Sequence, residues 1–410
     1  MHLSEVNVTT LSEHLLVDSA PAILPVHVIA SDAEALQAAR DFAVYASLDA
    51  VGRDRERRLP WAEIEHFTAS GLGGITTPLA YGGAEVSHVT LAEVFKIISQ
   101  ADPALGQIPQ NHFGVLSVVR HVAEPAQQQQ LFQSILKGCR IGNGGAERGT
   151  RNTLDIRTVA HREADGSYRI KGEKFYSTGA LFAHWVSIKA LDDDGKTVMA
   201  FIERGTQGLR IVDDWSGFGQ RTTASGTVLL DDVSVPAKQV VPFYRLDQSA
   251  NIQGSVSQLI QAAIDAGIAH AAVAEAITFV RDRGWSSRDA HVEQTLTEAR
   301  IMVEIAKLQI ELLAADALLE RAARTLDEVA RQPLDDAAAA RASVAVAEAK
   351  VITTEISLLA SEKLFELAGH GATRTELNLD RHWRNARTHT VHDPVRWQVH
   401  AVGNYHLNGA

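Results

Sequence analysis

Apolar residues recur at helical spacing in the first part of the chain and as short β-favouring runs in its middle. Helical spacing covers residues 32–54, 61–70, 91–99, 113–122 and 127–136, and Asp32 is a candidate cap for the first helix. The β-favouring runs are 156–160, 168–172, 185–189, 198–203 and 227–230. Asp165-Gly166 and Asp194-Gly195 between these runs are hairpin signals. The pattern predicts a helical segment followed by an all-β segment.

From about Gly254 onward the pattern is helical again and rich in alanine. Two long helices are predicted, at 290–329 and 335–368, separated before Pro333. Helices of this length need partners along their whole length, so a C-terminal four-helix bundle is the simplest arrangement. The alanine-rich faces are interpreted as oligomer contacts. We therefore expect a leader at 1–30, a helical domain at 31–138, a β domain at 139–245 and the bundle at 246–410.

Composition narrows the class of protein. The formal net charge of −11, without a long basic block, argues against a nucleic-acid partner. No apolar run approaches the length needed to span a bilayer, and the acidic residues of the first thirty positions do not resemble a secretory signal. Cys139 is the only cysteine, which excludes an intrachain disulfide and suits a reducing compartment. These features predict a cytoplasmic protein without a membrane partner.

Candidate chemistry is concentrated in residues 378–393, NLDRHWRNARTHTVHD. Three arginines recur at every third position and would form a cationic stripe on a helix, which is either a solvated face or a site for an anion or for carboxylates. His389 and His392 follow, just before the turn that Pro394 imposes. Their spacing also allows a metal site. However, no thiolate joins them and the arginines would oppose a cation, so we expect no metal.

Four motifs are spread along nearly the whole chain. They are Tyr81-Gly82-Gly83, the run KFYSTG at 174–179, the run LDDVSVP at 230–236, and Arg384-Asn385-Ala386-Arg387. Together with the order of the predicted elements, these motifs resemble the acyl-CoA dehydrogenase fold. The resemblance implies an α+β protein with an N-terminal helical domain, a central β-barrel or sandwich domain, a C-terminal four-helix bundle and a bound flavin.

Other motifs depart from true acyl-CoA dehydrogenases. The loop that reads Thr-Glu-Pro in those enzymes is Asn143-Gly144-Gly145-Ala146-Glu147-Arg148 here, and their catalytic Glu-Gly is matched by Asp393-Pro394. In contrast, Asp214-Trp215, the run GQRTTASG at 219–226 and the run LDRHWRNART at 379–388 resemble the reduced-flavin-dependent monooxygenase branch. Dibenzothiophene monooxygenase and sulfone-metabolism flavoproteins show the nearest pattern.

This resemblance implies a two-component enzyme. It would receive FMNH2 from an NAD(P)H-dependent flavin reductase, bind O2, and transfer one oxygen atom from a flavin C4a-hydroperoxide to a small organosulfur or aromatic heteroatom compound. It also implies a homotetramer. Two alternatives remain open. One is an acyl-CoA dehydrogenase or oxidase with bound FAD and Asp393 as base, and the other is a catalytically silent interaction protein with a flavin fold.

The resemblance also assigns candidate site residues. His392 is the expected proton donor and His389 the second choice, because the pKa of histidine lies near working pH; simple capping of the helix end is the alternative for His392. Ser177 is expected near the flavin N5 and peroxide, with Thr178 beside it. Asn143 is expected to contact the flavin or the oxygen intermediate, or else to form an ordinary Asn-Gly turn.

Two further kinds of contact are predicted for the flavin. Trp215 would stack on the isoalloxazine or wall the pocket, and a hydrophobic plug is the equal alternative. The phosphate is assigned to an arginine, since the guanidinium can bind it in a bidentate manner. Arg283 is preferred over Arg281 in the run FVRDRGW, for a phosphate of the same subunit or of a neighbouring one, and Arg374 in GHGATRT is a second candidate.

Overall fold

A computed structural model describes residues 20–150, 155–283 and 299–409. These residues form two compact units. The β unit consists of residues 20–22 and the described parts of Cys139–Ser216 and Ala224–Tyr244, and the helical unit consists of Ile23–Gly138, Gly217–Thr223 and the described parts of 245–410. Each unit is treated by itself below. The four domain boundaries proposed from the sequence stay a prediction.

The β unit is built on one eight-stranded sheet with the strand order β6-β7-β3-β2-β4-β5-β8, in which β1 pairs with β4. The two predicted Asp-Gly turns join the antiparallel pairs β2–β3 and β4–β5. The β1 strand, with the sequence IGNG, was not predicted because Ile141 is its only β-favouring residue. It runs parallel to β4, with Asn143 opposite Ser187. The strands are β1 (Ile141–Gly144), β2 (Val159–Arg162), β3 (Tyr168–Lys174), β4 (Trp185–Leu191), β5 (Thr197–Glu203), β6 (Leu209–Val212), β7 (Thr227–Val235) and β8 (Val240–Val241).

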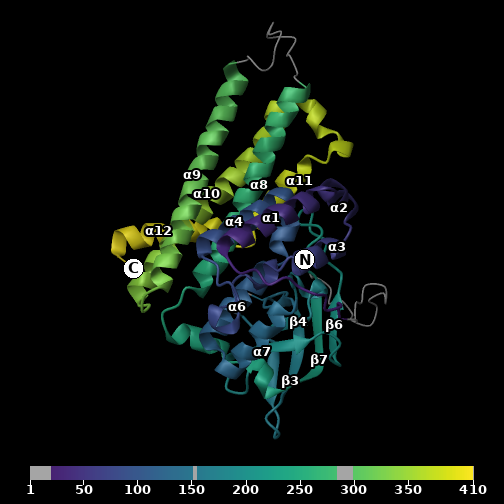
Figure 1. The fold of residues 1–410 in the computed structure, drawn as a ribbon, viewed down its shortest axis with the longest axis vertical. Helices are drawn as coiled ribbons and strands as arrows, with labels where there is room; N and C mark the ends of the chain where they lie inside the picture. Colours follow the sequence, from purple (N-terminus) through teal and green to yellow (C-terminus); the bar gives the residue numbers. More distant parts are fainter. Residues whose placement is uncertain (1–19, 151–154, 284–298, 410) are drawn as a thin grey trace. The chain divides into compact units, whose positions relative to one another are not determined.

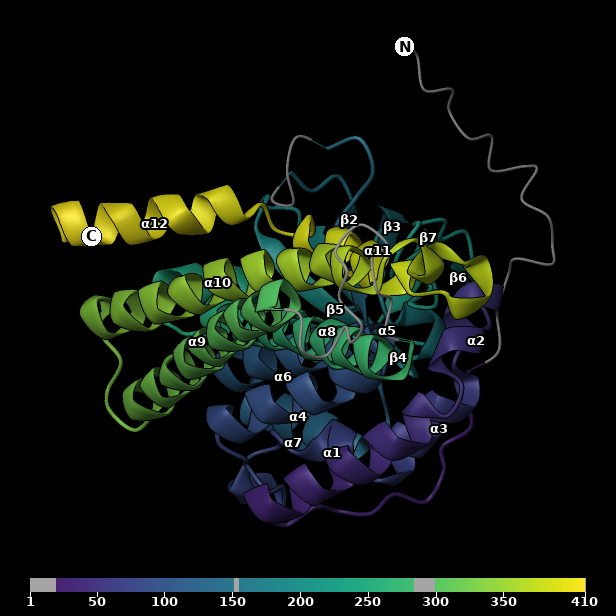
Figure 2. The same ribbon diagram turned by 90° about the horizontal axis from the view of Figure 1, so that it is seen from above.

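The helical unit contains the long helices α8, α9 and α10, which lie along one another in both views (Figures 1 and 2). The helices of this unit are α1 (Asp32–Ser47), α2 (Ala50–Glu56), α3 (Trp61–Ala69), α4 (His88–Ala101), α5 (Pro103–Gln107), α6 (Gln110–Val122), α7 (Pro125–Leu136), α8 (Gln253–Arg283), α9 (Ala299–Ala330), α10 (Asp336–Ala368), α11 (Asp380–Thr390) and α12 (Val395–Asn408). Short 3-10 turns precede α4 at Leu72–Gly74 and Leu79–Tyr81 and precede α11 at His370–Thr373 and Thr375–Leu377.

The prediction of one helix at 32–54 with Asp32 as its cap was wrong in both respects. Ser31 caps α1, its hydroxyl accepting from the Glu34 amide, while the Asp32 carboxylate accepts from the amide and hydroxyl of Ser87. The helix ends at Ser47 and a second helix begins at Ala50. A buried side chain explains the break, because the Arg53 guanidinium donates to the Ala46 carbonyl at the end of α1.

The helix α8 is the centre of the helical unit, packed against α4, α6, α9, α10 and α11. Its alanines Ala263, Ala266 and Ala269 are fully buried within this one chain and belong to its core. Ala274 of the same helix is exposed, and the interpretation of the alanine-rich faces as oligomer contacts stays a prediction. The prediction that no apolar run is long enough for a bilayer needs correction. Among the described residues, Gln253–Asp282 passes that test of length and composition. Its packing identifies it as a core helix.

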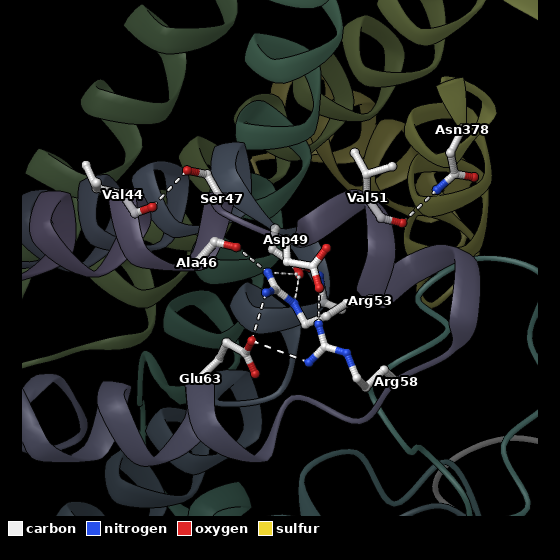
Figure 3. A network of polar contacts seen from close by, with 11 residues as sticks. Val44, Ala46, Ser47, Asp49, Val51, Arg53, Arg58, Glu63 and Asn378 are labelled. Carbon is white, nitrogen blue, oxygen red and sulfur yellow. Dashed lines mark hydrogen bonds and ion pairs between the residues drawn. The ribbon is translucent and has the colours of Figure 1, made fainter. Parts of the chain in front are cut away.

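A buried ion network joins α1, α2 and α3 to Asp102, the N-cap residue of α5. Figure 3 shows Arg53 of this network with Ala46 and Glu63. The Arg53 side chain is 1% exposed; its Nη1 lies 2.8 Å from Glu63 Oε1 and its Nη2 lies 2.9 Å from Asp102 Oδ2. Asp102 also caps α5, with Oδ1 3.0 Å from the Ala104 amide. One guanidinium therefore neutralises two buried carboxylates, and it fixes the corner between the first two helices.

Candidate active site

Four of the predicted flavin-contacting residues converge in the β unit. The Asn143 amide N–H donates to the Thr178 carbonyl at 3.0 Å, and its side-chain Nδ2 lies 3.2 Å from the Tyr176 carbonyl. The Tyr176 ring in turn meets the Trp215 ring edge-on, with centroids 6.2 Å apart. The side chain of Asn143 thus ties the end of β1 to the turn after β3. Asn143, Ser177, Thr178 and Trp215 therefore lie around the turn after β3, and we call these four residues the cradle.

Ser177 lies within the turn after β3 and is 1% exposed. Its amide donates to the Gly226 carbonyl, but its hydroxyl has no hydrogen-bond partner among the described residues. The neighbouring Thr178 hydroxyl is paired with Ser225 Oγ at 2.7 Å. A buried hydroxyl without a partner is costly unless a ligand or water supplies one. Ser177 is therefore the group in this cradle that is available to bind a ligand.

The loop that carries Trp215 is held close to the start of β7. Asp214 accepts from the amide of Thr227 at 2.8 Å and from its hydroxyl at 2.7 Å. A Cβ on Gly226 would lie 2.4 Å from both Asp214 Oδ1 and the Val212 carbonyl, so only glycine permits this approach. These contacts fix Trp215 beside the turn that contains Ser177, where its ring can form one wall of the cradle.

In the helical unit, His389 is buried rather than presented to solvent. Its Nδ1 lies 2.5 Å from Asp265 Oδ1 on α8, and its Nε2 lies 3.1 Å from Gln107 Oε1 on α5. The other oxygen of Asp265 accepts from Lys350 Nζ at 2.5 Å and from the Thr354 hydroxyl at 3.0 Å, both on α10. We call these five residues the Asp265 cluster. The Asp265 carboxylate joins α8 to α10 and α11, and His389 extends the cluster to α5.

The charge of the Asp265 cluster follows from its contacts. Burial alone would raise the pKa of Asp265, but Lys350 and His389 lower it to about 2, so the carboxylate is ionised. Burial lowers the pKa of His389, outweighing the opposite effect of Asp265, so its ring is neutral at pH 7. The cluster therefore contains one buried anion, one buried cation and a neutral imidazole.

His392 and Asp393 form a second polar group just beyond α11. His392 Nδ1 lies 3.0 Å from Asp393 Oδ2, and the same oxygen accepts from Gln258 Nε2 on α8 at 2.7 Å. The His392 side chain is 47% exposed in this chain, in contrast to the 1% of His389. Of the two predicted histidines, His392 is therefore the accessible one, and its ring is oriented by a carboxylate.

The predicted phosphate-binding arginines belong to the helical unit. Arg374 belongs to the helical unit, is 62% exposed and pairs with Glu376. Arg283 is the last residue of α8, and its side chain lies outside the described residues. The cationic stripe of α11 contacts carboxylates: Arg381 pairs with Glu275 and Arg384 with Asp54. The phosphate assignment stays a prediction.

Sequence reasoning missed Asp265, Lys350 and Gln107. The signal was available for the first two, because each is an isolated charge at a position where the helical pattern predicts burial. A buried charge requires a partner of opposite sign, so an acid on one core helix and a base on another predict a pair. Nothing in the pattern indicated that Gln107 completes this cluster, since α5 has only five residues.

Comparison with known proteins places the chain in a family. The family model for the acyl-CoA dehydrogenase N-terminal domain matches residues 31–139, and that for the C-terminal domain matches residues 259–397. The chain is 32% identical to the probable FMNH2-dependent monooxygenase SfnC of Pseudomonas putida over 384 residues, covering 91% of this chain and 95% of the relative.

Two solved structures are similar over the same extent. FMN-bound TdsC from Paenibacillus sp. A11-2 superposes with a TM-score of 0.87 at 28% identity, covering 92% of this chain and 98% of that one. Methanesulfinate monooxygenase MsuC from Pseudomonas fluorescens superposes with a TM-score of 0.84 at 30% identity, covering 92% of this chain and 97% of that one. The predicted fold and the predicted branch are both confirmed. The chain belongs to the acyl-CoA dehydrogenase family, within its branch of flavin-dependent monooxygenases.

Proposed function

We propose that the chain is the oxygenase component of a two-component FMNH2-dependent monooxygenase. It transfers one oxygen atom from O2 to a small organosulfur or aromatic heteroatom compound, and a separate NAD(P)H-dependent reductase supplies the reduced flavin. The observation that carries the proposal is the similarity to SfnC, which extends over 95% of that relative. When bound, reduced FMN supplies two electrons and the C4a carbon at which dioxygen is activated.

The residues of the β unit fit this cofactor. Ser177 offers a buried hydroxyl without a hydrogen-bond partner among the residues described, and Trp215 offers an aromatic face beside the neighbouring Tyr176. Asn143 positions the turn between them through the Tyr176 carbonyl. A planar, heteroatom-rich ring system needs such a hydrogen-bonding edge together with an apolar wall. In this proposal Ser177 binds the flavin edge, while Thr178 and Ser225 hold the loop in place.

His392 is the proposed proton donor to the reacting oxygen. Asp393 orients its ring, and Gln258 fixes Asp393 from α8. An imidazole in this arrangement can donate a proton and regain it from solvent, because part of the ring is exposed. His389 is a less suitable donor, since both of its ring nitrogens face protein groups.

The contacts of Asp393 disfavour the acyl-CoA dehydrogenase alternative. Abstraction of an α-proton from a thioester requires a carboxylate whose pKa is raised toward neutrality. Burial would raise the pKa of Asp393, but the His392 ring and Gln258 bring it below its usual value. A carboxylate stabilised in this way is a poor base. The geometry supports oxygen transfer over dehydrogenation.

The test uses the full chain with FMN, a flavin reductase, NADH and air. Incubation with a panel of sulfides, sulfones, sulfinates and indole should yield a product heavier by one oxygen atom, with label from 18O2. Omission of the reductase should abolish the product. If no panel member is oxygenated, and an acyl thioester instead bleaches FAD bound to the protein, the dehydrogenase alternative is correct.

Replacing Ser177 with alanine should weaken FMN binding by about 5- to 10-fold, because one hydrogen bond worth about 1 kcal/mol is lost. Thermal stability of the flavin-free protein should change little, since the hydroxyl has no hydrogen-bond partner in the part of the chain that the structure describes. Titration of FMN fluorescence measures the first effect and a melting curve the second. Thr178→Val is the matched control: it should lower the melting temperature by breaking the pair with Ser225.

The proposed assembly is a homotetramer. Large apolar side chains are exposed along one stretch of α9, where Met302, Val303, Ile310 and Leu313 are each at least half exposed. The helix α12 has no buried residue in this chain, and Trp397 is 60% exposed. Exposed apolar surface of this extent supports burial against further subunits. Sedimentation of the purified chain tests this proposal.

A further inference from the structure

Side-chain contacts join α8 to α11 and to the residues just beyond α11. From one end these are Gln258 to Asp393 at 2.7 Å, Asp265 to His389 at 2.5 Å, and Glu275 to both His382 at 2.5 Å and Arg381 at 2.6 Å. Two of these contacts are carboxylate–histidine pairs of equal length. The first two contacts involve α8 positions seven residues apart, so they lie on one face of that helix. The third lies about 15 Å from the second along α8.

Hydrogen-bond chemistry fixes the tautomer of His389. An ionised Asp265 carboxylate can only accept, so Nδ1 of His389 must carry the proton. With a neutral ring, Nε2 is then an acceptor, and the group that faces it must be a donor. Gln107 satisfies this when its side-chain amide is turned to present NH2, an orientation that heavy-atom positions do not distinguish. Every group of the Asp265 cluster then has a consistent role.

Stability alone is a poor reason for this cluster. A buried ion pair such as Asp265–Lys350 gains little over apolar side chains of the same volume, because both charges lose their hydration. What a carboxylate on Nδ1 does provide is a fixed tautomer and a fixed ring orientation. Apolar side chains cannot do this. Lys350 then serves as the counter-ion that keeps Asp265 ionised without adding a proton to His389.

The orientation of His389 bears directly on His392. The two residues are separated by one helical turn, and the His392 amide donates to the His389 carbonyl at 3.1 Å. The chain leaves α11 immediately after this turn and reaches Asp393 and Pro394. A shift of the His389 ring would therefore displace the backbone that carries His392. Misplacement by about 1 Å at a distance from the chemistry can cost about 100-fold in rate.

We propose that Asp265, with Lys350 as its counter-ion, is a positioning residue that fixes His389 as its Nδ1–H tautomer and thereby sets the position of His392. This inference rests on the proposed function. In productive turnover, substrate, O2 and FMNH2 give the oxygenated product, FMN and water. When His392 is misplaced, O2 and FMNH2 give H2O2 and FMN, and the substrate is unchanged.

The test is the double variant Asp265→Asn/Lys350→Met, which removes both buried charges and avoids leaving one unpaired. The product formed per FMNH2 consumed should fall by about 10-fold or more, with the difference recovered as H2O2. Selective 15N-histidine labelling provides a readout without flavin or turnover. The signals of the His389 ring are identified by their absence from the spectrum of a His389→Gln variant. They should show an Nδ1–H tautomer in the wild type and a mixture of tautomers in the double variant.

Glu275→Gln is the matched control, because it weakens the other carboxylate–histidine pair between the same two helices. It should lower the melting temperature but leave the product yield within about twofold. The inference is overturned if the double variant keeps the wild-type product yield per FMNH2 and the Nδ1–H tautomer of His389. It is also overturned if Glu275→Gln lowers the product yield as much as the double variant does. Failure of the wild type to oxygenate any substrate would overturn the proposed function instead, and the tautomer measurement would still stand.

Discussion

Replacing His392 with alanine should lower the product formed per FMNH2 consumed by about 100-fold or more, which is the usual contribution of a positioned acid or base. The missing product should appear as hydrogen peroxide. Flavin binding should stay within about twofold, because the predicted flavin contacts of the β unit do not include this side chain. The folded state should also tolerate the change, since the ring is 47% exposed and its bond to Asp393 is a surface contact. Product and peroxide are quantified in the same reductase-coupled assay.

Two variants separate proton donation from other roles of this ring. His392→Gln can still hydrogen-bond Asp393 but carries no ionisable proton. Its product yield per FMNH2 consumed should therefore be as low as that of the alanine variant. His400→Ala removes an exposed histidine of α12 that contacts the Trp397 ring, and it should behave like the wild type. A glutamine variant with normal yield would show that His392 acts only by holding Asp393. A large loss of FMN affinity in either variant at 392 would reassign it to cofactor binding.

The fold was predictable because its signals are local. Periodicity located the long core helices, and Asp-Gly turns located two hairpins that the sheet contains. The 14-residue helix α12 was not predicted. The other missed elements were short: β1 and β6 have four residues each, β8 has two and α5 has five. Elements this short are stabilised by their neighbours more than by their own side chains. Asn143, for example, is held in β1 by bonds to the turn after β3.

The candidate site was predictable in its residue types but not in its pairings. The histidines near the C-terminus were visible, yet nothing local indicates that one is buried and the other exposed. That difference depends on Asp265, 124 positions earlier in the chain, which holds His389 inside. The same limitation explains the arginine stripe. From the sequence the stripe could be a solvated face, but in the folded protein Arg381 and Arg384 pair with Glu275 and Asp54, which are distant in the sequence.

Arg53→Ala should produce the largest loss of stability among single changes outside the proposed site. The side chain is 1% exposed and is bonded to Asp102, Glu63 and the Ala46 carbonyl (Figure 3). Removing it leaves two buried carboxylates without a cation, and breaking a buried pair in this way costs about 3–5 kcal/mol. Urea unfolding followed by tryptophan fluorescence should report the loss, because Trp61 begins the helix that carries Glu63.

The loss of unfolding free energy in Arg53→Ala should increase as the pH rises. Burial raises the pKa of Asp102 even though Arg53 opposes the shift, so without Arg53 the folded protein should hold a proton on this carboxyl that the unfolded chain releases. Stability then falls as the pH rises, and the variant should lose more free energy of unfolding at pH 8 than at pH 5. Arg58→Ala is the control. That side chain is 44% exposed, pairs with Asp49 and lies 3.9 Å from Glu63, so its loss should cost less than about 1 kcal/mol at either pH. Equal losses in the two variants would mean that burial does not set the strength of this network.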